Sequence, residues 1–352
     1  MGRSRLHWRI NNMNIETVLN ANDQQIYERE FRDWLPEKIF DAHVHAFDES
    51  NFSTDYKFPE RSCFKKFGGT FTLEQCMEIA KVLLPDQEFS MNCFGNPDEE
   101  ADLEAACKYT GKIVDNKRVF GMALVSPKDD IETVKHRIND YGLVGYKPYR
   151  NFVNWMDYED VTIFDMLSPE QMEFANEKGL AITFHIPKAA RLADPCNQKQ
   201  MLEICQRYPN AKIIFAHIGR AYYMSNIIGF LDKINKCENA YMDSSMVSHP
   251  GVLEYAFNNF PRERIIFGSD APIAFLRGKS VEINDQYAYL MGENYAIGST
   301  IYDADKVVKF TTFFYEQLRG LKEATTKAGF SQKELEKFFY NNIYDLLSGI
   351  KV

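Results

Sequence analysis

Two histidines separated by a single residue, His43 and His45 in the segment Asp-Ala-His-Val-His, are the strongest candidates for chemistry in this chain. They follow an apolar run that begins at Ile39, as expected of a buried strand. Side chains two apart on a strand point to the same face, so both imidazoles can reach one ion. Taken alone, the pair is equally compatible with two histidines that only contribute to packing.

Three more polar residues stand at the ends of apolar runs in the second half of the chain. His185 and His217 each end such a run, and Asp270 directly follows the run at 265–269. In a parallel barrel the carboxyl ends of the strands converge, so these side chains would meet in space. Neutral imidazoles with one carboxylate suit Zn(II), and Mn(II), Fe(II) and Co(II) accept the same donors. The alternatives are a helix-capping role for Asp270 and a packing role for His217.

Eight short apolar runs, each leading into an amphipathic stretch, supply the strands that would position these residues. Their nearly continuous apolar character is typical of parallel strands that are covered on both faces and joined by right-handed crossovers. The predicted fold is therefore an α/β fold, a (β/α)8 TIM barrel. The runs occupy residues 39–43, 88–93, 119–125, 143–147, 181–185, 212–217, 240–243 and 265–269.

Local signals for helices lie between these runs. Ser168 is a predicted N-cap for a helix over 171–178, and Gly179 is its predicted end. Ser331 and Glu334, three residues apart, form a predicted capping box that opens the final helix. The alternation of strands and helices expected of a barrel is thus present along the chain.

The predicted organisation is one barrel domain over 38–352, preceded by an N-terminal helical extension over 1–37 that packs on it. The segment 48–69, rich in Phe, Lys and Asp, is predicted to be a long loop after the first strand. Long loops at that end of a barrel usually cover the site, so this loop is expected above the metal ligands.

The composition is that of an ordinary globular protein with a large core: 352 residues, 45% hydrophobic and 26% charged. The formal net charge of -9 argues against binding to nucleic acid or to a membrane surface, because both need a cationic face. We therefore expect a small-molecule substrate as the partner. The sequence leaves the oligomeric state open, a homodimer included.

The absence of a recognisable signal peptide or membrane span in the sequence, together with its cysteine pattern, predicts a cytoplasmic protein. No apolar run approaches the roughly 18 residues that cross a bilayer. The polar stretch from Asn11 stands where a signal peptide would have its apolar core. The seven cysteines are an odd number without a C-x-x-C pair, so neither a disulfide framework nor a cysteine zinc site is expected.

Taken together, these motifs resemble the amidohydrolase superfamily. The features that carry the resemblance are the H-x-H after the first strand, one histidine after each of the fifth and sixth strands, and Gly-Ser-Asp-Ala-Pro around Asp270. They are most similar to the amidohydrolase-related (amidohydrolase 2) branch, which contains aminocarboxymuconate-semialdehyde decarboxylase, resorcylate decarboxylases and dicarboxylate lactonases. The resemblance runs from about Ile39 to the C-terminus, and its motifs are specific in combination and weak singly.

The resemblance implies that His43, His45, His185 and Asp270 bind one divalent metal and that His217 lies beside it as a catalytic group. A bound divalent ion lowers the pKa of its water toward neutrality. Asp270 could then take the proton and deliver it to the leaving group, while His217 polarises or protonates the substrate oxygen.

Lys147 ends the fourth predicted strand in Gly-Tyr-Lys-Pro-Tyr-Arg, and three interpretations of it stay open. Some superfamily members carry a carbamylated lysine or a glutamate on this strand that bridges two metals. The branch named above is typically mononuclear, which favours an unmodified Lys147 that binds an anionic substrate group. A solvated surface lysine is the third interpretation.

Arg150 and Arg220 lie just beyond predicted strand ends, where their fork-shaped donors could bind a substrate carboxylate. Tyr222 follows in the same segment as Arg220 and is assigned to the same predicted substrate site. Each arginine alone could equally be a surface ion-pair partner. His249, in the loop after the seventh strand, is expected to stay away from the site.

Three functions fit these residues. The first is metal-dependent hydrolysis of an ester, lactone or amide bond in a small carboxylated compound, with metal-activated water as the nucleophile. The second uses the same ligands for non-oxidative decarboxylation, in which Asp270 or His217 protonates carbon. The third is an inactive barrel that serves as a binding protein, which would predict a broken ligand set. Release of carbon dioxide distinguishes the first two.

Overall fold

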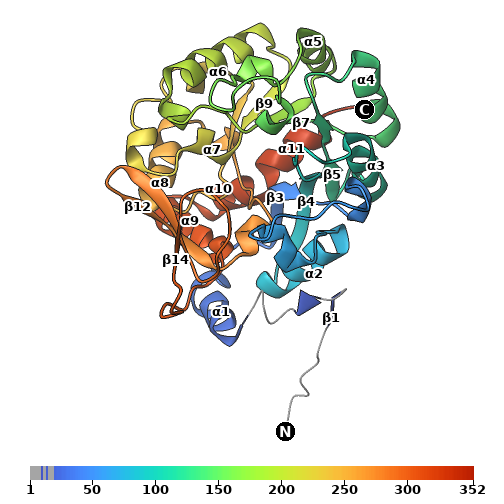
Figure 1. Cartoon of the computed structure of the whole chain (residues 1–352). Helices are drawn as coiled ribbons and strands as arrows, with labels where there is room; N and C mark the ends of the chain where they lie inside the picture. The colour runs from blue at the N-terminus through green and yellow to red at the C-terminus, as the bar shows by residue number, and fades with distance from the viewer. Residues whose placement is uncertain (1–8, 11–12, 15–19) are drawn as a thin grey trace.

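In the computed structural model, which describes residues 9–10, 13–14 and 20–352, every predicted apolar run contains a β-strand (Figure 1). The first barrel strand is β3 (Lys38–His45) and the last is β11 (Ile265–Ile266). The strands between them are β4 (Glu88–Phe94), β5 (Val119–Gly121), β6 (Ala123–Val125), β7 (Gly145–Pro148), β8 (Ala181–Phe184), β9 (Lys212–Phe215) and β10 (Ala240–Asp243).

Backbone hydrogen bonds close these strands into a ring. All neighbouring barrel strands pair in parallel. β5 and β6 are two halves of the third strand, which Met122 separates. At the seam between the last and first strands, the N–H of Ala42 donates to the carbonyl of Phe267 at 2.9 Å. The N–H of His45 donates to the carbonyl of Ala271 at 2.8 Å. The fold is therefore a (β/α)8 TIM barrel, as predicted.

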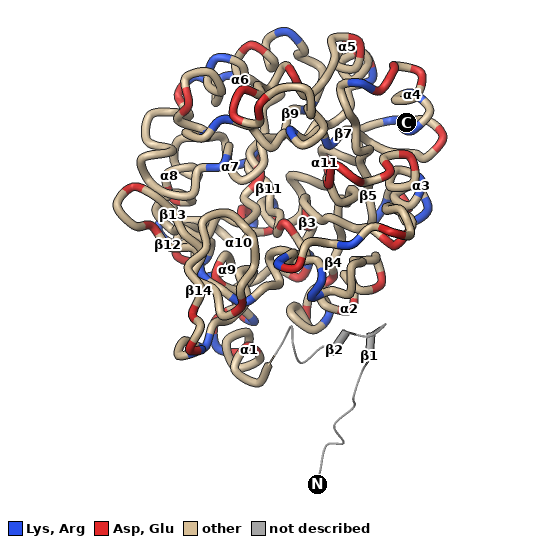
Figure 2. Tube along the Cα trace, viewed as in Figure 1, with Lys and Arg blue, Asp and Glu red and all other residues tan. Residues whose placement is uncertain are grey.

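Helices surround the ring, and residues of both charge signs are distributed along them (Figures 1 and 2). No helix in the part of the chain that the structure describes has the length and apolar character to cross a membrane. The helices that follow the first barrel strand are α2 (Leu73–Leu83), α3 (Leu103–Ile113), α4 (Ile131–Tyr141), α5 (Pro169–Lys178), α6 (Pro195–Arg207), α7 (His217–Arg220), α8 (Pro250–Asn259), α9 (Phe313–Lys327), α10 (Gln332–Glu336) and α11 (Asn342–Ser348).

Both predicted helix caps are confirmed. The side chain of Ser168 accepts from the backbone of Gln171, and Gly179 ends α5 with a φ of 65°, a left-handed conformation that favours glycine. Ser331 and Glu334 form the predicted capping box at the start of α10. The helix continues through the π-helical turn η12 (Lys337–Asn341) into α11.

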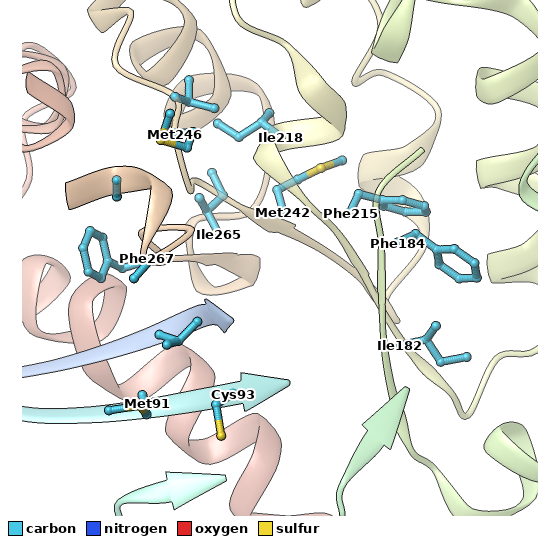
Figure 3. Close-up of a cluster of buried hydrophobic side chains, with 14 of the residues drawn as sticks. Met91, Cys93, Ile182, Phe184, Phe215, Ile218, Met242, Met246, Ile265 and Phe267 are labelled. Atoms are coloured by element: carbon cyan, nitrogen blue, oxygen red, sulfur yellow. The ribbon is translucent and has the colours of Figure 1, made fainter. Parts of the chain in front are cut away.

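The core has two parts. One lies between the strands and the outer helices, and Figure 3 shows part of it, including Met91 and Cys93 on β4 and Ile182 and Phe184 on β8. Each of these pairs is two residues apart, so its members point to the same face of their strand. The second part gathers apolar side chains of the barrel strands with those of α11 and fills the inside of the barrel. It includes Phe40, Ala42, Phe94, Phe120, Met122, Val144, Ala181, Ile214, Ile266, Ile343 and Leu347.

A β-bulge in β3 turns the two histidines toward the inside of the barrel. The register against β4 shifts between Asp41 and Val44. Ala42 packs with the inner cluster and Val44 with the outer one, although strict alternation would put both on the same face. The buried Asp41 carboxylate accepts the N–H of His43 at 3.0 Å, which stabilises the irregular backbone. Bulges commonly re-aim side chains at barrel rims.

A small sheet that the sequence analysis missed lies between the last barrel strand and α9. Its strands are β12 (Gly278–Ile283), β13 (Gln286–Met291) and β14 (Thr300–Tyr302). β12 and β13 form an antiparallel hairpin, and β14 pairs in parallel with β13. Asn284 and Asp285 make the turn with φ values of 49° and 58°, a conformation that Asn and Asp tolerate. The alternating residues around Asn-Asp were the signal for this hairpin.

The described part of the predicted N-terminal extension contains β1 (Arg9–Ile10), β2 (Met13–Asn14), α1 (Ala21–Ile26) and the π-helical turn η2 (Tyr27–Phe31). Residues 1–8, 11–12 and 15–19 of the extension lie outside the described residues. Buried Asp23 pairs with Arg277 at 2.6 Å. Arg319 on α9 contacts both carboxylate oxygens of Glu30, at 2.7 and 2.9 Å. These contacts support the predicted packing of the extension on the barrel domain over 38–352 for its residues 20–37.

The Glu30–Arg319 pair gives a test of this attachment. Arg319 donates to the Glu30 carboxylate and lowers its pKa to about 2. A carboxyl whose folded pKa is lowered stabilises the fold above its ordinary pKa, and this contribution is lost as the pH falls through the folded value. Glu30→Gln is expected to lower the free energy of unfolding by about 1 kcal/mol at pH 7. The difference from the wild type should shrink by pH 3, as urea unfolding at both pH values would show.

The control is Glu28→Gln, because Glu28 is more exposed and lies 3.6 Å from Arg32. It should leave stability unchanged within error at either pH. A Glu30→Gln effect of equal size at pH 7 and pH 3 would contradict the role given to the ionised carboxylate.

Candidate metal centre

Three of the four predicted metal ligands meet at the seam of the barrel. His43 and His45 come from the end of β3, and Asp270 follows β11. Asp270 Oδ1 lies 3.2 Å from Nε2 of His43 and 3.2 Å from Nε2 of His45. One ligand atom from each residue lies within 4.8 Å of the others. Because zinc–ligand bonds are about 2.0–2.2 Å long, one ion could contact all three.

Hydrogen bonds to the other ring nitrogens orient both histidines of β3. Nδ1 of His43 lies 2.6 Å from Oδ2 of Asp243, and Nδ1 of His45 lies 3.1 Å from the carbonyl of Gly95. Both partners accept, which assigns the ring protons to the Nδ1 atoms. The Nε2 atoms toward Asp270 then keep free lone pairs, as metal ligation requires.

Asp243, which the sequence analysis did not assign to the site, is the buried partner that holds His43. Ser245 donates to it twice, from its N–H at 2.7 Å and from its hydroxyl at 2.9 Å. A Cβ added to Gly268 would lie 2.6 Å from Asp243 Oδ1, so only glycine leaves room for this carboxylate. The sequence does hold a signal for Asp243, because it ends the apolar run 240–243 just as the candidate histidines end theirs.

His217 lies beside this group, although not at a strand end as predicted. β9 ends at Phe215, and His217 opens α7, whose four residues all have positive φ values, between 51° and 63°. The His217 ring stacks on that of His43 with centroids 5.1 Å apart. Its Nδ1 lies 2.9 Å from the carbonyl of Ser245, which assigns a proton to Nδ1 and leaves Nε2 free.

His185 directly follows β8 but is not part of the group within 4.8 Å. Its ring centroid lies 5.3 Å from that of His217 and 5.1 Å from that of Tyr149. Its Nδ1 is buried and has no hydrogen-bond partner. Because a buried polar atom normally has a partner, this nitrogen is available for an ion.

The histidines differ in pKa, because burial lowers the pKa of an imidazole while nearby carboxylates raise it. Burial lowers the pKa of His45, lowers that of His217 to about 4, and lowers that of His185 well below its ordinary value. These three are therefore neutral at pH 7, the form that binds metal. Burial and a nearby lysine would also lower the pKa of His43, but two adjacent carboxylates outweigh them and raise it.

The buried carboxylates also differ. Burial alone would raise the pKa of Asp270, but His43 and His45 hold it well below its ordinary value. His43 likewise lowers the pKa of Asp243 against the effect of burial. Burial raises the pKa of Asp41 to about 7. The ionised carboxylate of Asp270 and the neutral imidazoles of His45 and His185 are donors that fit a divalent ion, while Asp243 orients His43.

A cavity of about 450 Å³ opens above these ligands. His45, His185, His217 and Asp270 reach its surface. The predicted loop 48–69 contributes to its wall, as expected, and so does the missed sheet. The segment after β4 contributes as well. The lining side chains include Pro59, Ser62, Cys63 and Phe64 from the loop, Asn96 and Pro97 from the segment after β4, Tyr287 and Tyr289 from β13, and Ile297 from the connection to β14.

Lys147 is completely buried, so the interpretation of a solvated surface lysine is wrong. Its Nζ lies 4.9 Å from the ring centroid of Phe94 and has no hydrogen-bond partner. It is not among the residues that line the cavity. Burial lowers the pKa of Lys147 to about 8, while Asp270 and Asp243 oppose the shift. The amine thus lies beneath the site as a charge that faces the two carboxylates.

The other predicted substrate residues do not all line the cavity. Arg220 and Tyr222 line the cavity. Arg220 also donates to the carbonyl of Pro187 at 2.7 Å. Arg150 donates to the same carbonyl at 3.1 Å but lines a neighbouring hollow instead. His249 caps α8 and lies 3.0 Å from Glu282, away from the cavity, as expected.

A family model described as amidohydrolase matches residues 40–348. The comparison with curated protein sequences gives no match.

Similar solved structures carry several activities in their names. The chain is similar to 5-carboxyvanillate decarboxylase from Sphingomonas paucimobilis, with a TM-score of 0.54, 12% identity and coverage of 90% of this chain and 100% of that one. It is similar to amidohydrolase 2 from Bifidobacterium longum subsp. infantis, with a TM-score of 0.54, 15% identity and coverage of 90% and 100%. It is also similar to 4-oxalomesaconate hydratase from Rhodopseudomonas palustris, with a TM-score of 0.53, 14% identity and coverage of 88% and 95%. At such identities the likeness supports the fold alone.

Because Asp243 holds His43 in place, substitution of Asp243 is predicted to lower the affinity for metal. Asp243→Asn removes the charge that orients and polarises His43, and such changes typically weaken metal binding by about 10- to 100-fold. Competition with a zinc chelator, with melting temperatures recorded in parallel, measures the effect. Asp140→Asn is the matched control, because exposed His136 and Asp140 make the same 2.6 Å contact on the surface. Equal zinc affinity in wild type and Asp243→Asn would contradict the role given to Asp243.

Proposed function

Because the chain belongs to the amidohydrolase family, we propose that it is a metal-dependent hydrolase that acts on an ester, lactone or amide bond of a small carboxylated substrate. The observation that carries this proposal is the convergence of His43, His45 and Asp270 beneath a cavity of about 450 Å³. Their donor atoms are those of a divalent metal site.

We propose that His43, His45, His185 and Asp270 hold one divalent ion, Zn2+ first and Mn2+, Fe2+ or Co2+ as alternatives. The nitrogen and oxygen donors support this choice, and so does the unpartnered Nδ1 of His185. When bound, such an ion would lower the pKa of a water toward neutrality and polarise a substrate carbonyl.

Asp270 and His217 would move the protons. Asp270 is ionised and reaches the cavity, so it can accept a proton from the attacking water and pass it to the leaving group. His217 is neutral, with its Nδ1 proton held at the Ser245 carbonyl. Its Nε2 can therefore accept a proton and return it to a substrate oxygen.

The cationic groups explain why a carboxylated substrate is proposed. Arg220 lines the cavity, and Lys147 lies beneath it without a hydrogen-bond partner. A substrate carboxylate would gain a charge-assisted hydrogen bond from Arg220. We propose Tyr222 as a further contact and Lys147 as a positive charge that acts from below. Arg150 would act on a substrate only through the neighbouring hollow.

Non-oxidative decarboxylation is the second candidate. It is favoured by the similarity in fold to 5-carboxyvanillate decarboxylase, and the same residues could serve it. The substrate carboxylate would leave as carbon dioxide, and Asp270 or His217 would deliver a proton to the carbon. No water would be consumed.

The experiment is metal analysis of the purified protein, followed by a panel of lactones, amides, esters and aromatic acids. His43→Ala and Asp270→Ala are each expected to lose bound metal, and activity should fall by at least about 100-fold. His136→Ala is the control, because His136 is exposed and pairs with Asp140 on α4. Wild-type activity in either ligand variant would contradict the mechanism.

Product analysis on the same panel distinguishes the two reactions. Hydrolysis of an ester or lactone is expected to release one proton per turnover, which pH-stat titration would detect, and hydrolysis of an amide one amine, which an amine assay would detect. Neither reaction releases carbon dioxide. Carbon dioxide in equal amount to the product would replace the hydrolase proposal by the lyase one.

A further inference from the structure

The β12–β14 sheet forms one wall of the cavity. It follows the last barrel strand in the sequence, whereas the candidate ligands His43 and His45 lie on the first. Tyr287 and Tyr289, two residues apart on β13, both line the cavity. Residues two apart on a strand share a face, so this face of the hairpin is turned toward the site. The wall is therefore made by a strand rather than by an irregular loop.

Tyr287 is held from two sides. Its ring stacks on that of Tyr222, with centroids 4.6 Å apart and planes 28° apart. The guanidinium of Arg191 lies 4.2 Å from the Tyr287 ring centroid and 5.2 Å from that of Tyr222. Cations over aromatic faces and offset-stacked rings are both attractive. These contacts tie the hairpin to the segments that follow the fifth and sixth barrel strands.

Gly298 leaves the space in which Tyr287 lies. A Cβ on Gly298 would meet the Tyr287 hydroxyl at 3.1 Å and the Tyr289 ring at 3.3 Å. Its φ of 50° is also one that most side chains avoid. Gly298 itself lines the cavity. The two tyrosines are thus packed between the site and a glycine that permits their position.

The rings continue from this wall to the candidate metal centre. The Tyr222 ring lies 6.0 Å from that of His217. On another side, Tyr149 lines the cavity and stacks on His185. The aromatic rings of Tyr149, Tyr222 and Tyr287 therefore border the space above the ligands, and Arg220 is a cation among them. Such a space favours a flat conjugated ring that carries a carboxylate, because ring faces attract one another beyond their apolar area.

We propose that Tyr287 is a specificity-determining residue, which selects substrates with a flat conjugated ring over saturated ones of similar size. The inference rests on the proposed function for the site itself, since the carboxylate is taken to bind above the metal ligands. Arg191 acts as its positioning residue and does not touch the substrate.

The test compares binding of benzoate and cyclohexanecarboxylate to the full chain, purified and supplied with zinc. Isothermal titration measures both affinities in wild type, Tyr287→Leu and Tyr287→Phe. The wild type should prefer benzoate, and Tyr287→Leu should reduce this preference by about 2- to 10-fold, the range that one aromatic pair contributes. Tyr287→Phe keeps the ring and should keep the preference.

Tyr302→Leu is the matched control, because Tyr302 lies on β14 of the same sheet but is 40% exposed and does not line the cavity. It should leave both affinities unchanged. Equal affinities for the two acids in the wild type, no binding of either, or an unchanged preference in Tyr287→Leu would overturn the inference. Zinc content and turnover are measured on the same samples, and their absence together with a benzoate preference that Tyr287→Leu reduces would count against the proposed function instead.

Discussion

The backbone hydrogen bonds that close the barrel between β11 and β3 are the constraint on which the rest of the site depends. The N–H of Asp270 donates to the carbonyl of His43 at 2.9 Å, and the N–H of His45 donates to that of Ala271. Residues that follow the first and last barrel strands are therefore adjacent before their side chains interact at all. The parallel ladder sets the register, and the register decides that two imidazoles and one carboxylate share a small volume.

This arrangement is costly for the fold, because several charged groups are taken out of water. Buried charges are tolerated only where partners and hydrogen bonds compensate for lost hydration. Asp243 has His43 and Ser245 as partners, whereas Lys147 has no hydrogen-bond partner. Left-handed backbone adds roughly 1–2 kcal/mol for each non-glycine residue in α7. The strained backbone of α7 and the buried, unpartnered amine of Lys147 both lie at the C-terminal end of the barrel strands. Strain at such a position is typical of functional sites.

Much of the fold and part of the site could be predicted from the sequence, because they depend on local patterns. Apolar runs give strands, Ser168 and Gly179 give helix ends, and H-x-H gives two ligands on one face. The remainder depends on geometry that has no local pattern. The β-bulge at Asp41 changes which face the histidines take, and the left-handed turn at His217 moves that residue beyond the strand end. The Asn-Asp hairpin did have a local signal, which the sequence analysis missed.

The site thus has two parts with different structural origins. The ligands stand on strand ends that the barrel ladder holds rigidly, while the wall stands on β12–β14, whose ring contacts with the barrel segments run through Tyr222 and Arg191. Changes in the hairpin can therefore alter the shape of the cavity without moving the ligand atoms. Hydrolysis and decarboxylation would use the same proposed metal ligands, so the proposal assigns the choice between them to the way the wall orients the substrate carboxylate. Under the proposed function, the added sheet would therefore contribute to the choice of reaction together with the barrel beneath it.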